Sequence, residues 1–137
     1  MRWNMAALQY VFYVSRCLAS PRQVEEVLER SRSLNARSQL TGALLFTGGY
    51  FAQLLEGPAQ SIHSTMERIE ADSRHTAIRR LHEGPMVERR FGLWTMASTD
   101  VEGADDLLAH LLVVPEVGVE RVLRLIDVMF ENARPVV

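Results

Sequence analysis

The sequence has 137 residues, 47% of them apolar, and its formal net charge is −2. This length suits one domain with one hydrophobic core, and the apolar fraction argues against disorder. The absence of a basic cluster argues against a nucleic-acid partner. The sequence has no run of about 18 apolar residues, so it predicts no membrane-spanning helix. All 15 basic residues are arginines, which excludes a lysine-dependent phosphate loop and Schiff-base catalysis.

The cysteine and histidine content excludes further classes of protein. The single Cys17 cannot form an internal disulfide, so we expect a protein of the reducing cytoplasm. The four histidines lack the spacing of a metal site. Residues 1–7 lead into an alternating segment and do not resemble the apolar core of a signal peptide.

The first predicted elements are a strand and a helix. Residues 8–14 are rich in aromatic and β-branched side chains, a composition typical of a strand that is covered on both faces. Ser20, Pro21 and Gln23 then form the start signal of a helix, because Ser20 can cap it and Gln23 can complete a capping box. The apolar positions that follow recur at helical spacing as far as Leu34.

A hairpin and a second helix are predicted next. Residues 41–47 and 50–56 are two strands joined by a tight turn at Gly48 and Gly49. A helix begins after Pro58, and its apolar stripe consists of Ala59, Ile62, Met66 and Ile69.

Two more strands and two more helices complete the prediction. The strands cover residues 77–84 and 89–97, with a turn near Gly84 and Pro85. The order β-α-β-β-α-β-β predicts an α+β, ferredoxin-like sheet with an added strand and both helices on one face. Apolar stripes within residues 107–112 and 119–130 predict C-terminal helices that cover the other face.

Several side chains are unusual for a plain hydrophobic core. Gln53 lies within an apolar strand, and a buried amide without partners costs about 1–3 kcal/mol, so it is either hydrogen-bonded or exposed. Tyr13 in the first strand and Asn35 at the end of the first helix each have an ordinary structural explanation when taken alone. Trp94 and Met96 are expected on the same face of the strand 89–97, because strand side chains alternate.

Taken together, these residues resemble the BLUF family of blue-light sensors. The likeness rests on five blocks in order, which are residues 12–15 (Y-x-S), 31–42, 50–57 (F-x-Q-x-L-E-G), 72–75 (D-x-R-H) and 89–96 (R-x-F-x-x-W-x-M). The resemblance extends over about residues 8–98. It implies a flavin-binding domain over residues 1–98, followed by a C-terminal helical extension, residues 99–137, in the same globular unit.

The resemblance also implies a cofactor and its contacts. The family binds a flavin, usually FAD, between the two helices that pack on the sheet, and FMN is not excluded here. Tyr13 and Gln53 would be the photoactive pair, Asn35 would bind the polar edge of the flavin ring, and Ser31 would lie near the ring. Leu34 departs from the family, because several relatives carry His or Asn there and leucine has no hydrogen-bonding group.

The remaining site residues are implied in the same way. Arg74 and His75 would lie near the ribityl or phosphate end of the flavin. Met96 would contribute to the flavin site, and Trp94 and Met96 would belong to a switching strand in which they compete for the space beside Gln53. Light would drive electron and proton transfer from Tyr13 and leave the Gln53 amide rearranged.

Three functional hypotheses follow. The first is a photoreceptor that is not an enzyme, since only about forty residues follow the matched region, and that signals through a homo-oligomer or an unidentified downstream protein. The second is a small enzyme similar to the acylphosphatases, with Arg16, Arg37 or Arg74 acting beside Asn35. The third is an interaction module of the same descent that has lost its flavin, for which Leu34 is the one hint.

Overall fold

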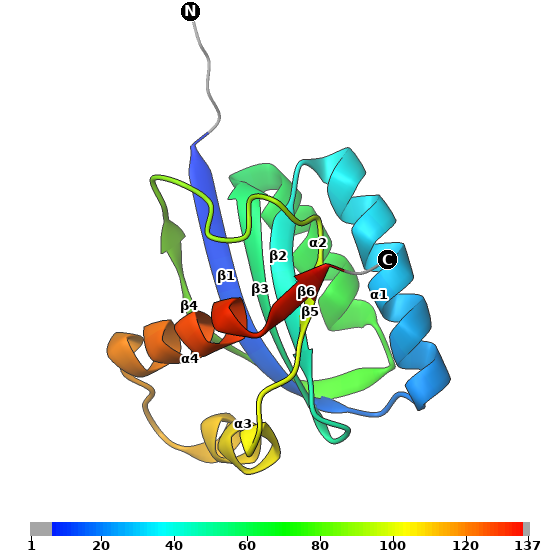
Figure 1. The fold of residues 1–137 in the computed structure, drawn as a ribbon, viewed down its shortest axis with the longest axis vertical. Helices are drawn as coiled ribbons and strands as arrows, with labels where there is room; N and C mark the ends of the chain where they lie inside the picture. Colours follow the sequence, from blue (N-terminus) through cyan, green and yellow to red (C-terminus); the bar gives the residue numbers. More distant parts are fainter. Residues whose placement is uncertain (1–6, 136–137) are drawn as a thin grey trace, which may run out of the picture.

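The computed structural model describes residues 7–135, so the expectations for residues 1–6 and 136–137 lie outside the described residues. The elements follow one another as β1 (Leu8–Cys17), α1 (Pro21–Ser38), β2 (Thr41–Phe46), β3 (Tyr50–Pro58), α2 (Ala59–Ala71), β4 (His75–Pro85), β5 (Ala97–Thr99), α3 (Ala104–Val113), α4 (Val119–Glu131) and β6 (Ala133–Pro135) (Figure 1). The strands form one mixed sheet in the order β4-β1-β3-β2-β5-β6. The predicted α+β, ferredoxin-like fold is confirmed.

Pairing between strands places the two central candidate residues side by side. β1 pairs antiparallel with both β3 and β4, and in the β1–β3 register Tyr13 lies opposite Gln53. β2 pairs antiparallel with β3 and places Leu44 opposite Gln53 from the other side. Gln53 therefore lies in the middle of the sheet, where its side chain must point into one of the two layers.

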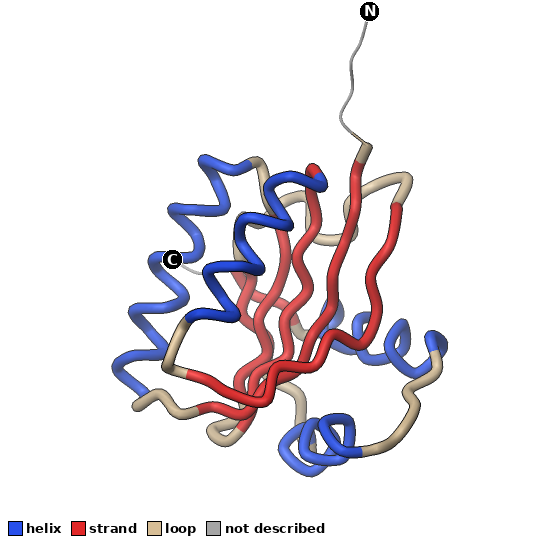
Figure 2. The backbone as a smooth tube through the Cα atoms, turned by 180° about the vertical axis from the view of Figure 1, so that it is seen from behind, coloured by secondary structure: helices blue, strands red, loops and turns tan. Residues whose placement is uncertain are grey.

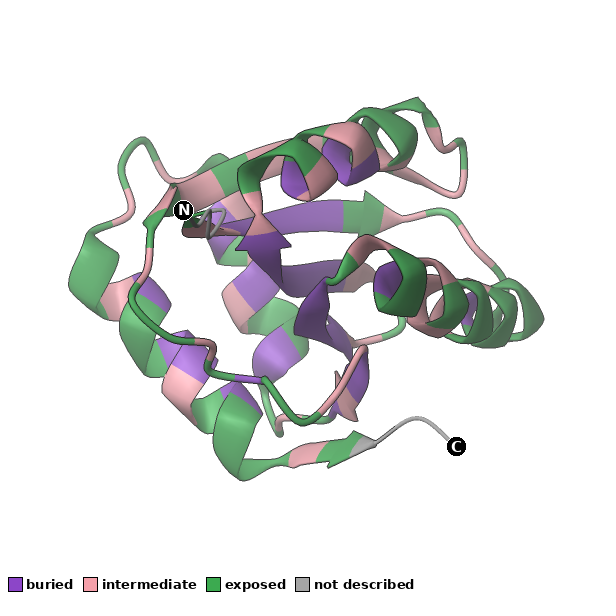
Figure 3. Cartoon of the chain, turned by 90° about the horizontal axis from the view of Figure 1, so that it is seen from above, coloured by how far each residue is buried: buried purple, intermediate pink, exposed green. Residues whose placement is uncertain are grey.

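Both faces of the sheet are covered by helices (Figure 2). Tyr13, Leu44 and Phe51 belong to the hydrophobic cluster on the face covered by α1 and α2, which we call the α1–α2 face. Phe12 and Leu54, their neighbours of opposite parity, belong to the cluster with α3 and α4, on the α3–α4 face. Figure 3 shows the buried residues gathered along the strands and along the inner sides of the helices. The expected cover by C-terminal helices is confirmed.

The predicted start of α1 is confirmed in detail. The Ser20 hydroxyl accepts a hydrogen bond from the backbone N–H of Gln23, and the Gln23 side chain accepts one from the backbone N–H of Ser20. This reciprocal capping satisfies two helix N–H groups that would otherwise lack partners. The helix ends at Ser38, and the φ of 60° at its C-cap residue Gln39 is left-handed.

The predicted strand over residues 89–97 is wrong. Only Ala97–Thr99 form a strand, and β5 pairs parallel with β2. Residues 86–96, which we call the crossing segment, run from β4 at one edge of the sheet across the α3–α4 face to β5 on the far side of β2 (Figure 1). The expected turn at Gly84 and Pro85 therefore ends β4 without starting a hairpin. Periodicity could not reveal this, because the apolar and aromatic residues of the segment pack against the sheet without pairing in it.

Candidate functional site

The α1–α2 face contains a cleft of about 400 Å³, which lies within the range of small-molecule sites, roughly 300–1,000 Å³. Its walls come from α1, α2, the turn after α2 and the floor of the sheet. Six of the predicted site residues line it, namely Tyr13, Ser31, Asn35, Gln53, Arg74 and His75. The other side chains along it are largely apolar, among them Val27, Leu34, Leu44, Phe51 and Ile69.

Tyr13 and Gln53 form a hydrogen-bonded pair in the floor of the cleft. The Tyr13 hydroxyl donates to Oε1 of Gln53, and the two residues are only 3% and 5% exposed. Burial, and secondarily the negative charge of Asp72, raise the pKa of Tyr13 above its usual value. The phenol is therefore a neutral hydrogen-bond donor at physiological pH.

The other end of the Gln53 amide faces Met96. Its Nε2 lies 3.8 Å from the Met96 sulfur, which is a weak acceptor, and Met96 is fully buried in the α1–α2 cluster. The amide is thus well satisfied at its oxygen and poorly satisfied at its nitrogen. A ligand with a stronger acceptor in the cleft could compete for that nitrogen.

Asn35 is positioned by the last turn of α1 and is 2% exposed. Its Nδ2 donates to the backbone carbonyl of Thr95 at 2.8 Å, which ties the helix to the crossing segment. Among the described residues this is the one hydrogen bond of its side chain, so Oδ1 keeps its capacity to accept. Ser31 and Leu34 lie beside it along the same wall.

His75 is held by the protein on both sides of its ring. Its Nδ1 lies 2.9 Å from the Ser15 hydroxyl, and its Nε2 lies 2.6 Å from the carbonyl oxygen of Ile69 at the end of α2. The ring also meets Tyr13 edge to face, with centroids 6.2 Å apart. His75 therefore acts as part of the cleft wall and joins α2 to the sheet.

Arg74 lines the cleft as an ion pair with Asp72. Its guanidinium donates three hydrogen bonds to the carboxylate, at 2.6, 2.9 and 3.2 Å. These bonds lower the pKa of Asp72 and raise the pKa of Arg74. The pair leaves little net charge at this end of the cleft.

Two arginines were missed at the sequence level. Arg30 and Arg68 line the cleft from α1 and α2, and neither forms an ion pair within residues 7–135. Their spacing could have revealed them, because Arg30 lies one helical turn before Leu34 on α1, and Arg68 lies one helical turn before Asp72. They give the cleft a positive charge that Arg74 alone does not supply.

Trp94 and Met96 are not on one face, contrary to the expectation from strand alternation. Met96 lies under Gln53 on the α1–α2 face, whereas Trp94 packs with Phe91 and Phe130 on the α3–α4 face. The reason is that the chain is irregular here, so the period-2 rule of strands does not apply. The space beside Gln53 is occupied by Met96.

Other kinds of site find no support in residues 7–135. No group of three or more His, Cys, Asp or Glu side chains in that range could hold a metal ion. None of its helices is both long and apolar enough to cross a membrane.

Comparison with known proteins gives one consistent family. The family model for BLUF, sensors of blue-light using FAD, matches residues 8–97. The beta subunit of photoactivated adenylate cyclase from Euglena gracilis is 31% identical over 100 residues, which make up 72% of this chain and 12% of that protein. The blue light- and temperature-regulated antirepressor BluF of Escherichia coli is 36% identical over 89 residues, 64% of this chain and 22% of that protein.

Solved structures agree with this match. The dark-state structure of BlrB, a BLUF protein, superposes with a TM-score of 0.78 at 31% identity and covers 93% of this chain and 98% of its own. The light-regulated adenylyl cyclase of a bacterium superposes with a TM-score of 0.69 at 24% identity, but only 40% of that chain is covered. The chain therefore spans a small part of the curated relatives it matches and nearly the whole length of BlrB.

Proposed function

The chain belongs to the BLUF family of blue-light sensors, and on that premise we propose that it is a photoreceptor that binds FAD in the α1–α2 cleft. In this proposal it signals by a change of shape and is not itself an enzyme. The observation that carries it is the buried hydrogen bond between Tyr13 and Gln53 in the floor of that cleft.

The residues of the cleft fit a flavin. Its apolar walls suit a flat ring system, while the amides of Gln53 and Asn35 can meet a polar ring edge with both donors and acceptors. Of these two amides, the Asn35 Oδ1 accepts no hydrogen bond from a described residue, and the Gln53 Nε2 has only the weak acceptor Met96. Arg30 and Arg68 supply positive charge for a phosphate group, which supports FAD without excluding FMN.

Tyr13 and Gln53 would form the switch. A bound flavin would absorb blue light and accept an electron and a proton. Tyr13 is the donor in reach of the site, because its phenol is neutral and already hydrogen-bonded to Gln53. Rotation of the Gln53 amide would exchange its oxygen and nitrogen, so that Tyr13 faces a donor and Met96 faces an oxygen. Such an exchange rewires hydrogen bonds with almost no change in side-chain volume.

The output would pass through the crossing segment to α4. Met96 contacts Gln53, and Trp94, two residues earlier, packs against Phe130 of α4 with ring centroids 6.2 Å apart. A shift of Met96 would therefore reach the C-terminal helices. From there the signal would go to a downstream protein or to a second copy of the chain.

An absorption spectrum tests this proposal. The purified protein should be yellow, and blue light should shift its flavin absorption reversibly to the red. Tyr13→Phe and Gln53→Leu should each keep the colour and lose the shift, because each removes one partner of the pair. Tyr50→Phe is the matched control, since its hydroxyl makes no hydrogen bond to any described residue, and it should shift normally.

Other outcomes would favour the competing hypotheses. Failure to bind added FAD would favour a flavin-less interaction module. A colourless protein with acylphosphatase activity would favour the enzyme. A normal red shift in Tyr13→Phe or Gln53→Leu would contradict the assigned roles even if the protein binds flavin.

A further inference from the structure

The crossing segment is attached to the sheet by a buried carboxylate. Glu56 in β3 is 0% exposed, and its two oxygens accept hydrogen bonds from the backbone N–H groups of Arg90 and Phe91, at 2.5 and 2.8 Å. The Thr41 hydroxyl donates a third bond to it at 3.1 Å. Hydrogen bonds to a charged acceptor are stronger than neutral ones, and burying a charge demands that such partners stay in place.

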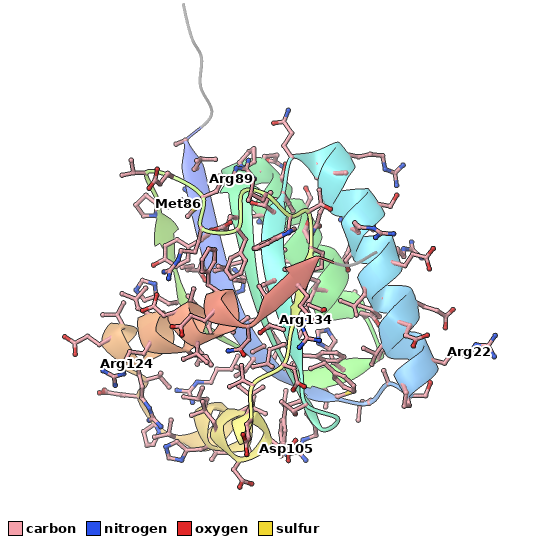
Figure 4. The ribbon with its side chains drawn as sticks, in the orientation of Figure 1. Arg22, Met86, Arg89, Asp105, Arg124 and Arg134 are labelled. Carbon is pink, nitrogen blue, oxygen red and sulfur yellow. The ribbon has the colours of Figure 1, made fainter. Side chains whose placement is uncertain are left out.

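An arginine reinforces this attachment from the same segment. Arg89 donates to the Thr41 hydroxyl at 3.0 Å, to the backbone carbonyl of Glu56 at 3.2 Å and to that of Gln39 at 2.7 Å. The segment is thereby fixed to the end of α1, the start of β2 and the end of β3 at once. Figure 4 shows Arg89 over this end of the sheet, with Asp105 near the opposite end.

After Phe91, the crossing segment contacts the residues of the proposed switch. The Trp94 carbonyl accepts from the Gly42 N–H at 3.3 Å, the Thr95 carbonyl accepts from Asn35, and Met96 contacts Gln53. The partners of Thr95 and Met96 in these contacts are Asn35 and Gln53, whose side chains line the cleft. The residues from 92 to 96 thus lie between a rigid point at Glu56 and a point that responds to the cleft.

The residues near the rigid point also contact α4. Phe91 and Trp94 pack against Phe130 with centroids 5.4 and 6.2 Å apart, and the Arg90 guanidinium stacks over the same ring and pairs with Asp127. Glu56 lies three residues after Gln53 on β3, so the two side chains point to opposite faces of the sheet. One strand therefore carries both the switch and the anchor of its output.

We propose that Glu56 is a positioning residue for signal output, which anchors the crossing segment so that movement at Thr95 and Met96 displaces Trp94 against α4. Without the anchor, the same movement would be absorbed by rearrangement of residues 90–96. The inference rests on the proposed photoreceptor function and deepens it. It assigns Glu56 no part in binding the flavin, because its side chain lies on the far face from the cleft.

The test uses Glu56→Gln in the FAD-loaded protein with Trp3→Phe, so that Trp94 is the remaining tryptophan. In the dark, hydrogen exchange in the segment around Arg90 and Phe91 should be faster by about tenfold, because two charge-assisted bonds are weakened. Under blue light the red shift of the flavin should stay intact. The light-induced change in Trp94 fluorescence should be lost.

Asp105→Asn is the matched control. Asp105 accepts a hydrogen bond from the Thr47 hydroxyl at 2.8 Å, away from the crossing segment, so the substitution removes a carboxylate charge and weakens one hydrogen bond without loosening the anchor. It should keep the Trp94 response. Thr41→Val is the milder second variant if Glu56→Gln folds poorly, because it removes only the hydroxyl that joins Arg89 to Glu56, and it should weaken the Trp94 response in the same direction.

The outcomes separate this inference from the function it rests on. An undiminished light-induced change in Trp94 fluorescence in a folded Glu56→Gln or Thr41→Val protein would refute the anchoring role of Glu56. An equal loss of that change in Asp105→Asn would also refute it, because it would show a general effect on stability. A wild-type protein that binds FAD but shows no red shift would refute the proposed function, and the output role would fall with it.

Discussion

The Tyr13–Gln53 hydrogen bond predicts a measurable coupling in stability as well as in spectra. Both side chains are at most 5% exposed, so removing one partner leaves the other polar group buried without its bond. Such an unsatisfied group costs about 1–3 kcal/mol. Tyr13→Phe and Gln53→Leu should therefore each lower the free energy of unfolding by that amount.

The double variant should cost much less than the sum of the two. When both polar groups are replaced by apolar ones of similar shape, no orphaned donor or acceptor remains, and the change can be nearly neutral. We expect a coupling energy of about 1–2 kcal/mol, within the range of about 0.5–3 kcal/mol for residues in direct contact.

Urea denaturation of the flavin-free protein provides the assay. With a denaturant slope of about 1–3 kcal/mol per molar urea, each single variant should lower the unfolding midpoint by about 1 M. Tyr50→Phe serves as the control, and should change stability by no more than about 0.5 kcal/mol because its hydroxyl has no partner among the described residues. Strictly additive single effects would refute the pairing of these two side chains.

Two further predictions concern the cleft. Leu34→Asn should tighten flavin binding about 2- to 12-fold, because one new hydrogen bond contributes about 0.5–1.5 kcal/mol. Fluorescence titration with FAD measures this affinity. Unchanged or weaker binding would show that Leu34 does not face the polar ring edge. The raised pKa of Tyr13 should keep the light-induced red shift constant in amplitude from pH 7 to about 10. Above about pH 10, where an unfolded tyrosine ionises but buried Tyr13 does not, folding stability should fall as pH rises, and a shift already lost near pH 8 would contradict the neutral buried phenol.

Much of the fold was predictable because its signals are local. The capping box at Ser20 and Gln23, the Gly48-Gly49 hairpin and the apolar stripes of the helices depend on neighbours a few residues away, and each was confirmed. The crossing segment was mispredicted because its backbone N–H groups bind a carboxylate 34 and 35 residues distant instead of a neighbouring strand. No local pattern reports such a partner.

The candidate site was also predictable only in part from the sequence. Residue types and their order along the chain were sufficient to indicate the BLUF family and to single out Tyr13, Asn35 and Gln53. Only the tertiary structure decided that Tyr13 bonds to Gln53, that Met96 lies beneath that amide, and that Trp94 packs on the opposite face. The physical reason is that a side chain's chemistry belongs to the residue, whereas its partner and the direction it faces depend on strand register and on long-range packing.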